Sequence, residues 1–131
     1  MITYAERVCF RPAHLHLLTF VEAHVARVSD AWGNELRCHE LARAVLLVCN
    51  RDHGLEVLDG KCGPIEHSWL RFSDGGVILD PYVPGRLPAV QIVDPIVGVA
   101  YLPGPSRSDI RQGIVDRLVL EMRGDLLTSA R

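Results

Sequence analysis

Three stretches of the chain carry apolar residues at the spacing of an α-helix. The first predicts a helix over about residues 12–28, beginning at a proline, which is tolerated in a first helical turn. The second, over about 38–49, is apolar over most of its circumference after the first turn, so we expect it to be central and buried. The third predicts a helix over 109–123, with Ser106 or Ser108 as its cap. The apolar positions of the first and third helices are Leu15, Leu18, Val21, Val25, Val28, Ile110, Ile114, Leu118 and Met122.

Between the second and third helices the pattern is that of β-strands. The predicted strands cover residues 55–58, 65–72, 77–82, 90–93 and 96–102. Residues 29–34 are expected to form a loop, Asp59-Gly60 a turn that closes the first strand, and 73–76 a hairpin turn. Pro103-Gly104-Pro105 is expected to end the last strand. Two helices, a run of strands and a final helix predict a single α+β domain over residues 1–131.

The composition is that of an ordinary globular protein, with 48% hydrophobic and 23% charged residues. The formal net charge of -2 lacks the basic excess of a nucleic-acid-binding protein, so no nucleic-acid partner is expected. The sequence shows neither the long apolar run of a membrane span nor the basic start and apolar stretch of a secretory signal. Its four cysteines include no Cys-x-x-Cys pair, which favours free thiols over a zinc ribbon or a disulfide scaffold. We therefore expect a cytoplasmic protein without a cofactor.

Three residues are arranged as a catalytic triad would require. Cys38 stands where a loop gives way to the buried helix, and there the helix dipole and free backbone N–H groups favour a thiolate. If residues 74–75 form a two-residue turn, Trp69 faces Asp80, and if the loop is 72–75, His67 faces Asp80 directly. In both registers His67 and Asp80 project from the same face, because side chains alternate with period two. A carboxylate on one imidazole nitrogen leaves the other to take a proton from Cys38.

The segments CHELA (38–42), HSWL (67–70) and VILDPY (77–82) resemble the core of transglutaminase-like and other papain-like proteins. The resemblance covers about residues 34–82. It implies a papain-like fold in which the Cys-bearing helix packs on an antiparallel sheet. It also implies thiol-based acyl transfer on a protein, peptide or amide substrate, by peptide or isopeptide hydrolysis, amide deamidation or transamidation.

One part of the papain-type pattern is missing. Papain-type peptidases have a glutamine shortly before the cysteine that stabilises the oxyanion, whereas this chain has Trp32, Gly33 and Asn34 there. Asn34 or the indole of Trp32 could donate instead, together with the backbone N–H of Cys38. Alternatively, Trp32 packs on the sheet and Asn34 is a turn residue. Trp69 is expected either to form a wall of the site or to belong to the core.

Two other interpretations stay open at this point. A papain-like domain without catalysis would serve as a binding or assembly module. Cys38, His39 and His67, with Asp80, could instead crowd around a zinc ion, since these side chains are zinc ligands. Cys62 could approach the same site, or it packs beneath it.

Overall fold

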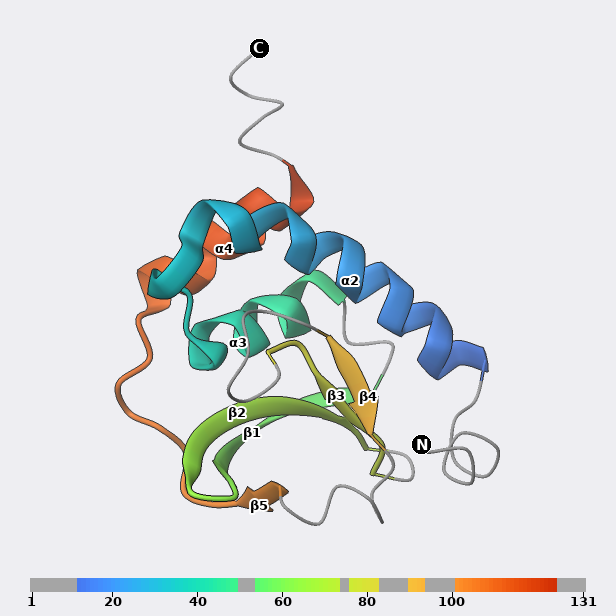
Figure 1. Cartoon of the computed structure of the whole chain (residues 1–131), viewed down its shortest axis with the longest axis vertical. Coiled ribbons are helices and arrows are strands. Elements are labelled where there is room, and N and C mark those ends of the chain that lie inside the picture. The colour runs from blue at the N-terminus through green and yellow to red at the C-terminus, as the bar shows by residue number, and fades with distance from the viewer. Residues whose placement is uncertain (1–11, 50–53, 74–75, 83–89, 94–100, 125–131) are drawn as a thin grey trace.

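The chain forms two layers, with helices on one side and an antiparallel sheet on the other (Figure 1). The computed structural model describes residues 12–49, 54–73, 76–82, 90–93 and 101–124, and the account that follows concerns these residues. The helices within them are α2 (Pro12–Trp32), η1 (Gly33–Glu35, a short 3-10 helix), α3 (Cys38–Cys49) and α4 (Gln112–Arg123). The α+β class predicted from the pattern is confirmed.

The sheet is built around one long hairpin. Its strands are β1 (Leu55–Cys62), β2 (Ile65–Phe72), β3 (Ile78–Asp80), β4 (Gln91–Val93) and β5 (Tyr101–Pro103), in the order β4-β3-β2-β1-β5. Strands β1 and β2 pair along their whole length, and every neighbouring pair is antiparallel. The three short strands therefore extend the hairpin on both sides.

The pairing of β2 with β3 has the register of a two-residue turn, one of the two registers considered above. His67 and Asp80 consequently project from the same face of the sheet, as predicted. Leu70 and Leu79 project from the other face and join the core beneath the helices. The paired residues are Leu70 with Leu79 and Arg71 with Ile78.

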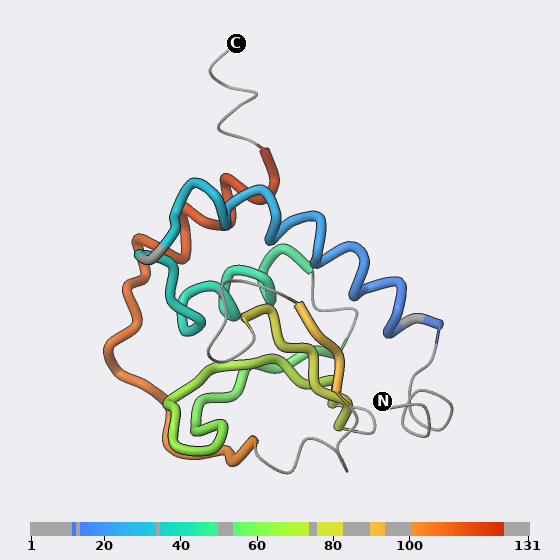
Figure 2. The backbone as a smooth tube through the Cα atoms, in the orientation of Figure 1, coloured from blue at the N-terminus to red at the C-terminus, as the bar shows by residue number. Residues whose placement is uncertain are grey.

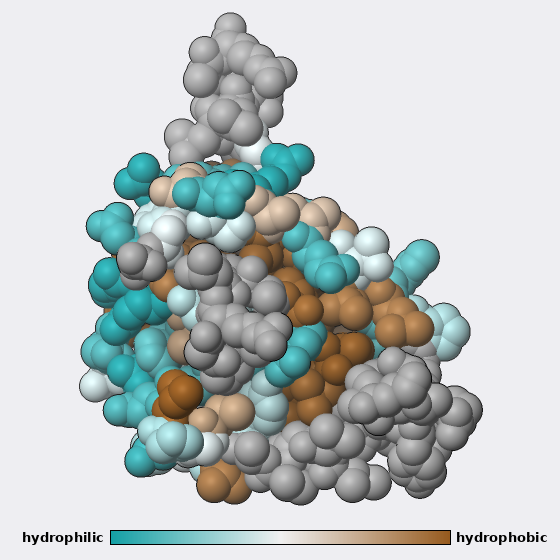
Figure 3. Space-filling view, in the orientation of Figure 1, coloured by the Kyte–Doolittle hydropathy of each residue, from teal (hydrophilic) through white to brown (hydrophobic). Residues whose placement is uncertain are grey.

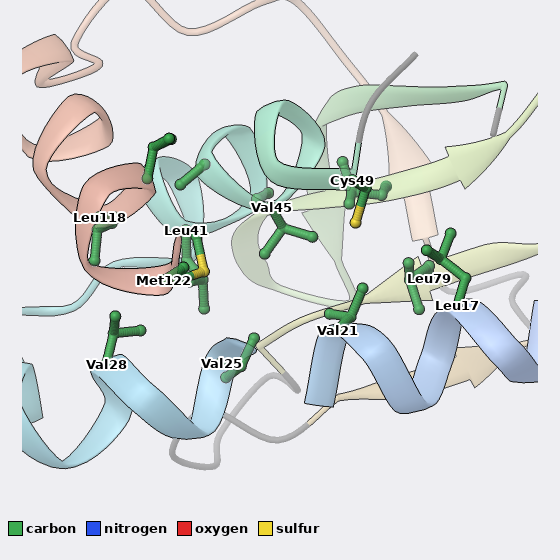
Figure 4. Close-up of a cluster of buried hydrophobic side chains, with 14 of the residues drawn as sticks. Leu17, Val21, Val25, Val28, Leu41, Val45, Cys49, Leu79, Leu118 and Met122 are labelled. Atoms are coloured by element: carbon green, nitrogen blue, oxygen red, sulfur yellow. The ribbon is translucent and has the colours of Figure 1, made fainter. Parts of the chain in front are cut away.

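Helix α3 occupies the centre of the core. It contacts α2 and α4 on one side and β1 and β2 on the other. Figure 4 shows Leu41 and Val45 of α3 meeting Met122 of α4 and Val21 of α2, and each of these four side chains is at most 1% exposed. The helix has the predicted bounds, because its start follows a loop and its apolar run ends where turn-forming residues begin.

Helix α2 is longer than the pattern predicted. The expected loop over 29–34 is wrong in its first part, since α2 continues to Trp32 and η1 follows. Val28 is fully buried and Trp32 packs against the core, so burial holds the last turn helical. Leu15, one of the apolar positions at helical spacing, is 48% exposed, whereas Leu17 packs in the core.

Strand β1 also runs further than predicted. Asp59-Gly60 lies inside the strand, which continues to Cys62. The buried carboxylate of Asp59 is satisfied by Arg43 and Ser68, and this partnering allows an aspartate inside the sheet. The turn that does end β1 is Gly63-Pro64, where Gly63 adopts φ +60 in the left-handed region.

Helix α4 begins later than expected and without a serine cap. Its N-cap residue is Arg111, whose side chain makes no capping hydrogen bond, so neither Ser106 nor Ser108 has the predicted role. The backbone N–H of Arg111 donates instead to the carboxylate of Glu40 in α3, at 3.1 Å. A side chain from a neighbouring helix thus binds the chain just before Gln112, where α4 starts.

The last predicted strand is found in part. β5 covers Tyr101–Pro103, whereas residues 96–100 lie outside the described residues. Pro103 is tolerated because β5 is an edge strand of the described sheet. From β5 the chain passes along one side of the molecule to α4, beside the start of α3, where Arg37 pairs with Asp109 (Figure 2). In the view of Figure 3, hydrophilic side chains gather on this side.

Candidate active site

Cys38 is the first residue of α3 and is partly exposed. A helix N-terminus presents backbone N–H groups without intrahelical acceptors, and these favour a thiolate. The imidazole of His39 hydrogen-bonds to the sulfur, with Nδ1 3.5 Å away, and the imidazole of His67 also acts on the ionisation of the thiol. Burial alone raises the pKa of Cys38, but the hydrogen bonds from His39 and His67 outweigh burial and lower the pKa to about 6.

The other described cysteines have the opposite electrostatics. Burial raises the pKa of Cys49 to about 12, and burial together with the charge of Asp80 raises the pKa of Cys62. Cys62 lies opposite Tyr101 in the β1–β5 pair, on the flank of the site. Among these thiols, Cys38 is therefore the one set up to ionise near neutral pH.

His67 of β2 and Asp80 of β3 form a buried pair. The Nε2 atom of His67 lies 2.8 Å from Oδ2 of Asp80, and neither residue is more than 1% exposed. Burial alone lowers the pKa of His67, but the hydrogen bond to Asp80, helped by Cys38, outweighs burial and raises the pKa to about 9. Because Nε2 is engaged by Asp80, Nδ1 is the nitrogen left to exchange a proton with Cys38. Of the three residues predicted as the triad, the structure thus joins His67 to Asp80 by a hydrogen bond, and His67 is among the groups that lower the pKa of Cys38.

The carboxylate of Asp80 has further partners that the sequence did not reveal. Its Oδ2 accepts the hydroxyl of Tyr101 at 2.7 Å, and its Oδ1 accepts the backbone N–H of Tyr82 at 3.0 Å. Gln91 in turn donates to the Tyr101 oxygen at 2.8 Å. Burial, followed by the charge of Asp80, raises the pKa of Tyr101 well above its usual range, so its hydroxyl stays a donor.

Tyr101 reaches Asp80 only because the sheet is strongly curved. β5 and β3 are separated by β1 and β2 in the strand order, a distance of about 14 Å across a flat sheet. The rings of His67, Trp69 and Tyr101 fill the face enclosed by this curvature, with centroids 5.2 to 6.1 Å apart. The only sequence signal for Tyr101 was a phenol within an otherwise apolar predicted strand.

Trp69 lies beside His67, on the face where it was expected. Its ring stacks near the imidazole at an interplanar angle of 18°, and the residue is 1% exposed. Trp69 therefore packs against His67 from within the protein and contributes almost no accessible surface.

The two residues considered as oxyanion donors are placed differently. The indole N–H of Trp32 donates to Glu121 of α4 at 2.6 Å, and the guanidinium of Arg117 lies 5.4 Å from the ring centroid. Its donor is thus used at α4, and we assign Trp32 no role at Cys38. Asn34 is within η1, but its side chain lies outside what the structure describes. The backbone N–H of Cys38 is the donor that stays in the hypothesis.

The zinc interpretation has no support from the geometry. Within the described ranges, no three His, Cys, Asp or Glu side chains are grouped as ligands of a metal ion. The helices of the same ranges include none with the length and apolar character needed to cross a bilayer.

Comparisons with protein-family models, with curated proteins and with solved structures found no match to this chain.

Proposed function

We propose that this protein is a cysteine-dependent acyl-transfer enzyme with a papain-like, transglutaminase-like core. Cys38 is the nucleophile, His67 carries the proton and Asp80 orients His67. The observation that carries the proposal is the buried His67–Asp80 hydrogen bond of 2.8 Å, together with the mutual effect of His67 and Cys38 on their pKa values.

The ionisation of the pair supports this assignment. A thiol with a pKa of about 6 and an imidazole with a pKa of about 9 coexist at pH 7 as thiolate and imidazolium. The two values belong to the coupled pair, since each charge stabilises the other. Such an ion pair supplies a nucleophile and a general acid in the same resting state.

The reaction follows from these roles. The Cys38 thiolate attacks the carbonyl carbon, and the resulting oxyanion accepts the backbone N–H of Cys38. The His67 imidazolium gives its Nδ1 proton to the leaving amine, the C–N bond breaks, and a thioester remains on Cys38. Neutral His67 then takes a proton from water or from a second amine, which attacks the thioester and releases the thiolate. Throughout, Asp80 holds Nε2–H of His67 and stabilises the imidazolium.

The acceptor determines which reaction results. Water gives hydrolysis of a peptide or isopeptide bond, or deamidation of a side-chain amide, whereas an amine gives transamidation. A protein, peptide or amide is the substrate class implied by the resemblance of 38–42, 67–70 and 77–82 to the family. The free thiols of Cys38, Cys49 and Cys62 suit a reducing compartment, and a cytoplasmic location is part of the proposal.

A second candidate is a papain-like binding or assembly module without catalysis. The burial of the site favours it, because His67 and Trp69 are each 1% exposed and leave little surface for a substrate. The two functions differ in what happens at the sulfur, so acylation of Cys38 separates them.

The test is acylation by p-nitrophenyl acetate at pH 7. The enzyme proposal expects a burst of nitrophenolate of one equivalent, with the acetyl group found on Cys38 by peptide mass spectrometry. Cys38→Ala should lose the burst, and Cys62→Ala, a thiol deletion outside the triad, should keep it. Acylation of Cys38 no faster than that of Cys62 would leave the binding module as the function.

A further inference from the structure

A second imidazole lies beside the Cys38 sulfur and has no part in the triad. The Sγ atom is 3.5 Å from Nδ1 of His39 and 4.0 Å from its Nε2. His39 is itself buried, at 8% exposed, in the first turn of α3. Its Nδ1 also lies 2.8 Å from Oγ of Ser68 in β2.

The partners of Ser68 determine which ring nitrogen of His39 carries a proton. The Ser68 hydroxyl donates to Oδ1 of Asp59 at 2.5 Å. Burial alone raises the pKa of Asp59, but hydrogen bonds from Arg43, Ser68 and Arg107 outweigh burial and lower it, so the carboxylate is ionised and can only accept. Because the single hydroxyl hydrogen points to Asp59, Ser68 can only accept from His39. The proton of neutral His39 therefore resides on Nδ1, the nitrogen nearer the sulfur.

Arg43 fixes both ends of this chain of contacts. It donates to Oδ2 of Asp59 at 2.6 Å and to the backbone carbonyl of His39 at 3.0 Å. The backbone N–H of Arg107 adds a third donor to Asp59, at 3.0 Å. With Asp59 held on several sides, the hydroxyl of Ser68 and the ring of His39 have little freedom to reorient.

The geometry points to His39 as a second N–H donor to the Cys38 thiolate, with Ser68 and Asp59 as positioning residues that hold its tautomer. The Nδ1–H is shared between the oxygen of Ser68 and the sulfur. His39 has the fixed donor role, while His67 exchanges the proton. The inference deepens the proposed function, on which it rests only in taking Cys38 as a thiolate.

The test measures the ionisation of Cys38 without requiring turnover. The full chain is alkylated with iodoacetamide from pH 4.5 to 9.5, and modification of Cys38 is followed by peptide mass spectrometry. The ionisable groups facing the sulfur are His39 of α3 and His67 of β2, with Asp80 and Asp59 acting through His67 and Ser68. We expect a midpoint near pH 6 for the native chain.

His39→Ala should raise the midpoint by about one pH unit, which is a tenfold loss of thiolate below the midpoint. His39→Asn restores a donor near the position of Nδ1 and should return most of the shift, as a residue that merely fills space would not. Ser68→Ala should raise the midpoint less than His39→Ala, and His16→Asn, an exposed histidine of α2, should leave it unchanged. Circular dichroism establishes that each variant is folded.

An unchanged midpoint in folded His39→Ala overturns the inference. If His39→Ala does not fold, an unchanged midpoint in both His39→Leu and Ser68→Ala overturns it, and a raised midpoint in either supports it. A chain that never acylates but keeps a His39-dependent midpoint removes the proposed function and leaves this inference standing. A chain that acylates at Cys38 but has a midpoint independent of His39 overturns this inference and leaves the proposed function standing.

Discussion

Cys38 and His67 shift each other's ionisation in opposite directions, and this mutual shift is the smallest unit on which the proposed chemistry depends. The pKa of the thiol falls to about 6 and that of the imidazole rises to about 9. Removing either partner should move the pKa of the other back toward its usual value, because His67, after His39, lowers the pKa of Cys38, and Cys38, after Asp80, raises the pKa of His67. Two predictions follow at the scale of single residues.

The first concerns pH. With a peptide p-nitroanilide as substrate, kcat/KM should rise through about pH 6 as Cys38 ionises and fall through about pH 9 as His67 loses its proton. Alkylation of Cys38 needs only the thiolate. Its rate should therefore rise through about pH 6 and should not fall through about pH 9. A fall of both rates at high pH would mean that unfolding, not loss of the general acid, sets the upper limb.

The second concerns substitution. Cys38→Ala and His67→Ala should each abolish turnover, and the double variant should be no worse than either, because the residues act as a unit. Asp80→Asn should retain a weaker activity, since thiol and imidazole are still present. The measurement is kcat/KM of the single and double variants. Losses that simply add on a logarithmic scale would contradict a triad.

At the same scale, the sequence predicted that His67 and Asp80 share a face, but it predicted neither the contact of Tyr101 with Asp80 nor that of His39 with the Cys38 sulfur. Strand periodicity fixes which residues share a face, and that was enough for His67 and Asp80. Tyr101 belongs to a strand that reaches Asp80 through sheet curvature, which no local spacing encodes. The sequence shows that His39 follows Cys38, but the proposed donor role depends on Ser68 and its partner Asp59, and Asp59-Gly60 is typical of a turn.

At the scale of elements, α3 is held to the start of α4 by Glu40, a fully buried carboxylate. It accepts the guanidinium of Arg37 and both the backbone N–H and the side chain of Arg111. Burial alone raises the pKa of Glu40, but the hydrogen bonds from Arg37 and Arg111 outweigh burial and lower it to about 2. The first turn of α3, which carries Cys38, is therefore anchored by a charge.

A stability prediction follows for Glu40. Because its pKa is depressed on folding, its contribution is fully present above about pH 4.5 and is lost as the pH falls toward 2. Glu40→Gln should lower the free energy of unfolding at pH 7 by about 2 kcal/mol, since it leaves partly exposed arginines without their partner. Urea unfolding from pH 7 to pH 3.5 should also show a smaller pH dependence for this variant. Glu22→Gln, an exposed change on α2, is the control, and an equal effect there would contradict the anchor.

The elements show what local pattern can and cannot predict. The bounds of α3 and β2 were predicted correctly, because their apolar runs end at turn-forming residues. β1 was predicted too short because Asp59-Gly60 is typical of a turn, and only the contacts of Asp59 with Arg43 and Ser68 make it part of a strand. The prediction of a serine cap for α4 was wrong for a related reason. The carboxylate that binds the chain before this helix belongs to Glu40, which is remote from α4 in sequence.

At the scale of the whole molecule, the curvature of the sheet determines whether β5 can complete the site. β5 crosses Gly60 so closely that a Cβ there would lie 2.1 Å from the carbonyl oxygen of Leu102 and 2.9 Å from Cα of Pro103. Both neighbours are backbone atoms and cannot rotate away. A glycine in β1 thus permits the close approach of β5, and this approach carries Tyr101 toward Asp80.

The last prediction tests this link between sheet shape and site. Gly60→Ala should displace β5 and lower the free energy of unfolding by about 1–3 kcal/mol, the usual cost of overpacking. Gly104→Ala is the matched control, because its Cβ would meet only Cα of Gly60, at an ordinary 3.6 Å. Tyr101→Phe should cost stability in the native background by removing a donor to buried Asp80.

Combining the two changes gives the decisive comparison. If Gly60→Ala has already moved Tyr101 away from Asp80, Tyr101→Phe should cost much less in that background than in the native one. Equal costs in both backgrounds would mean that Tyr101 keeps its contact regardless of how closely β5 packs on β1. The curvature would then be set by the packing of the helices on the other face of the sheet. Gly60 would affect only how closely β5 packs on β1.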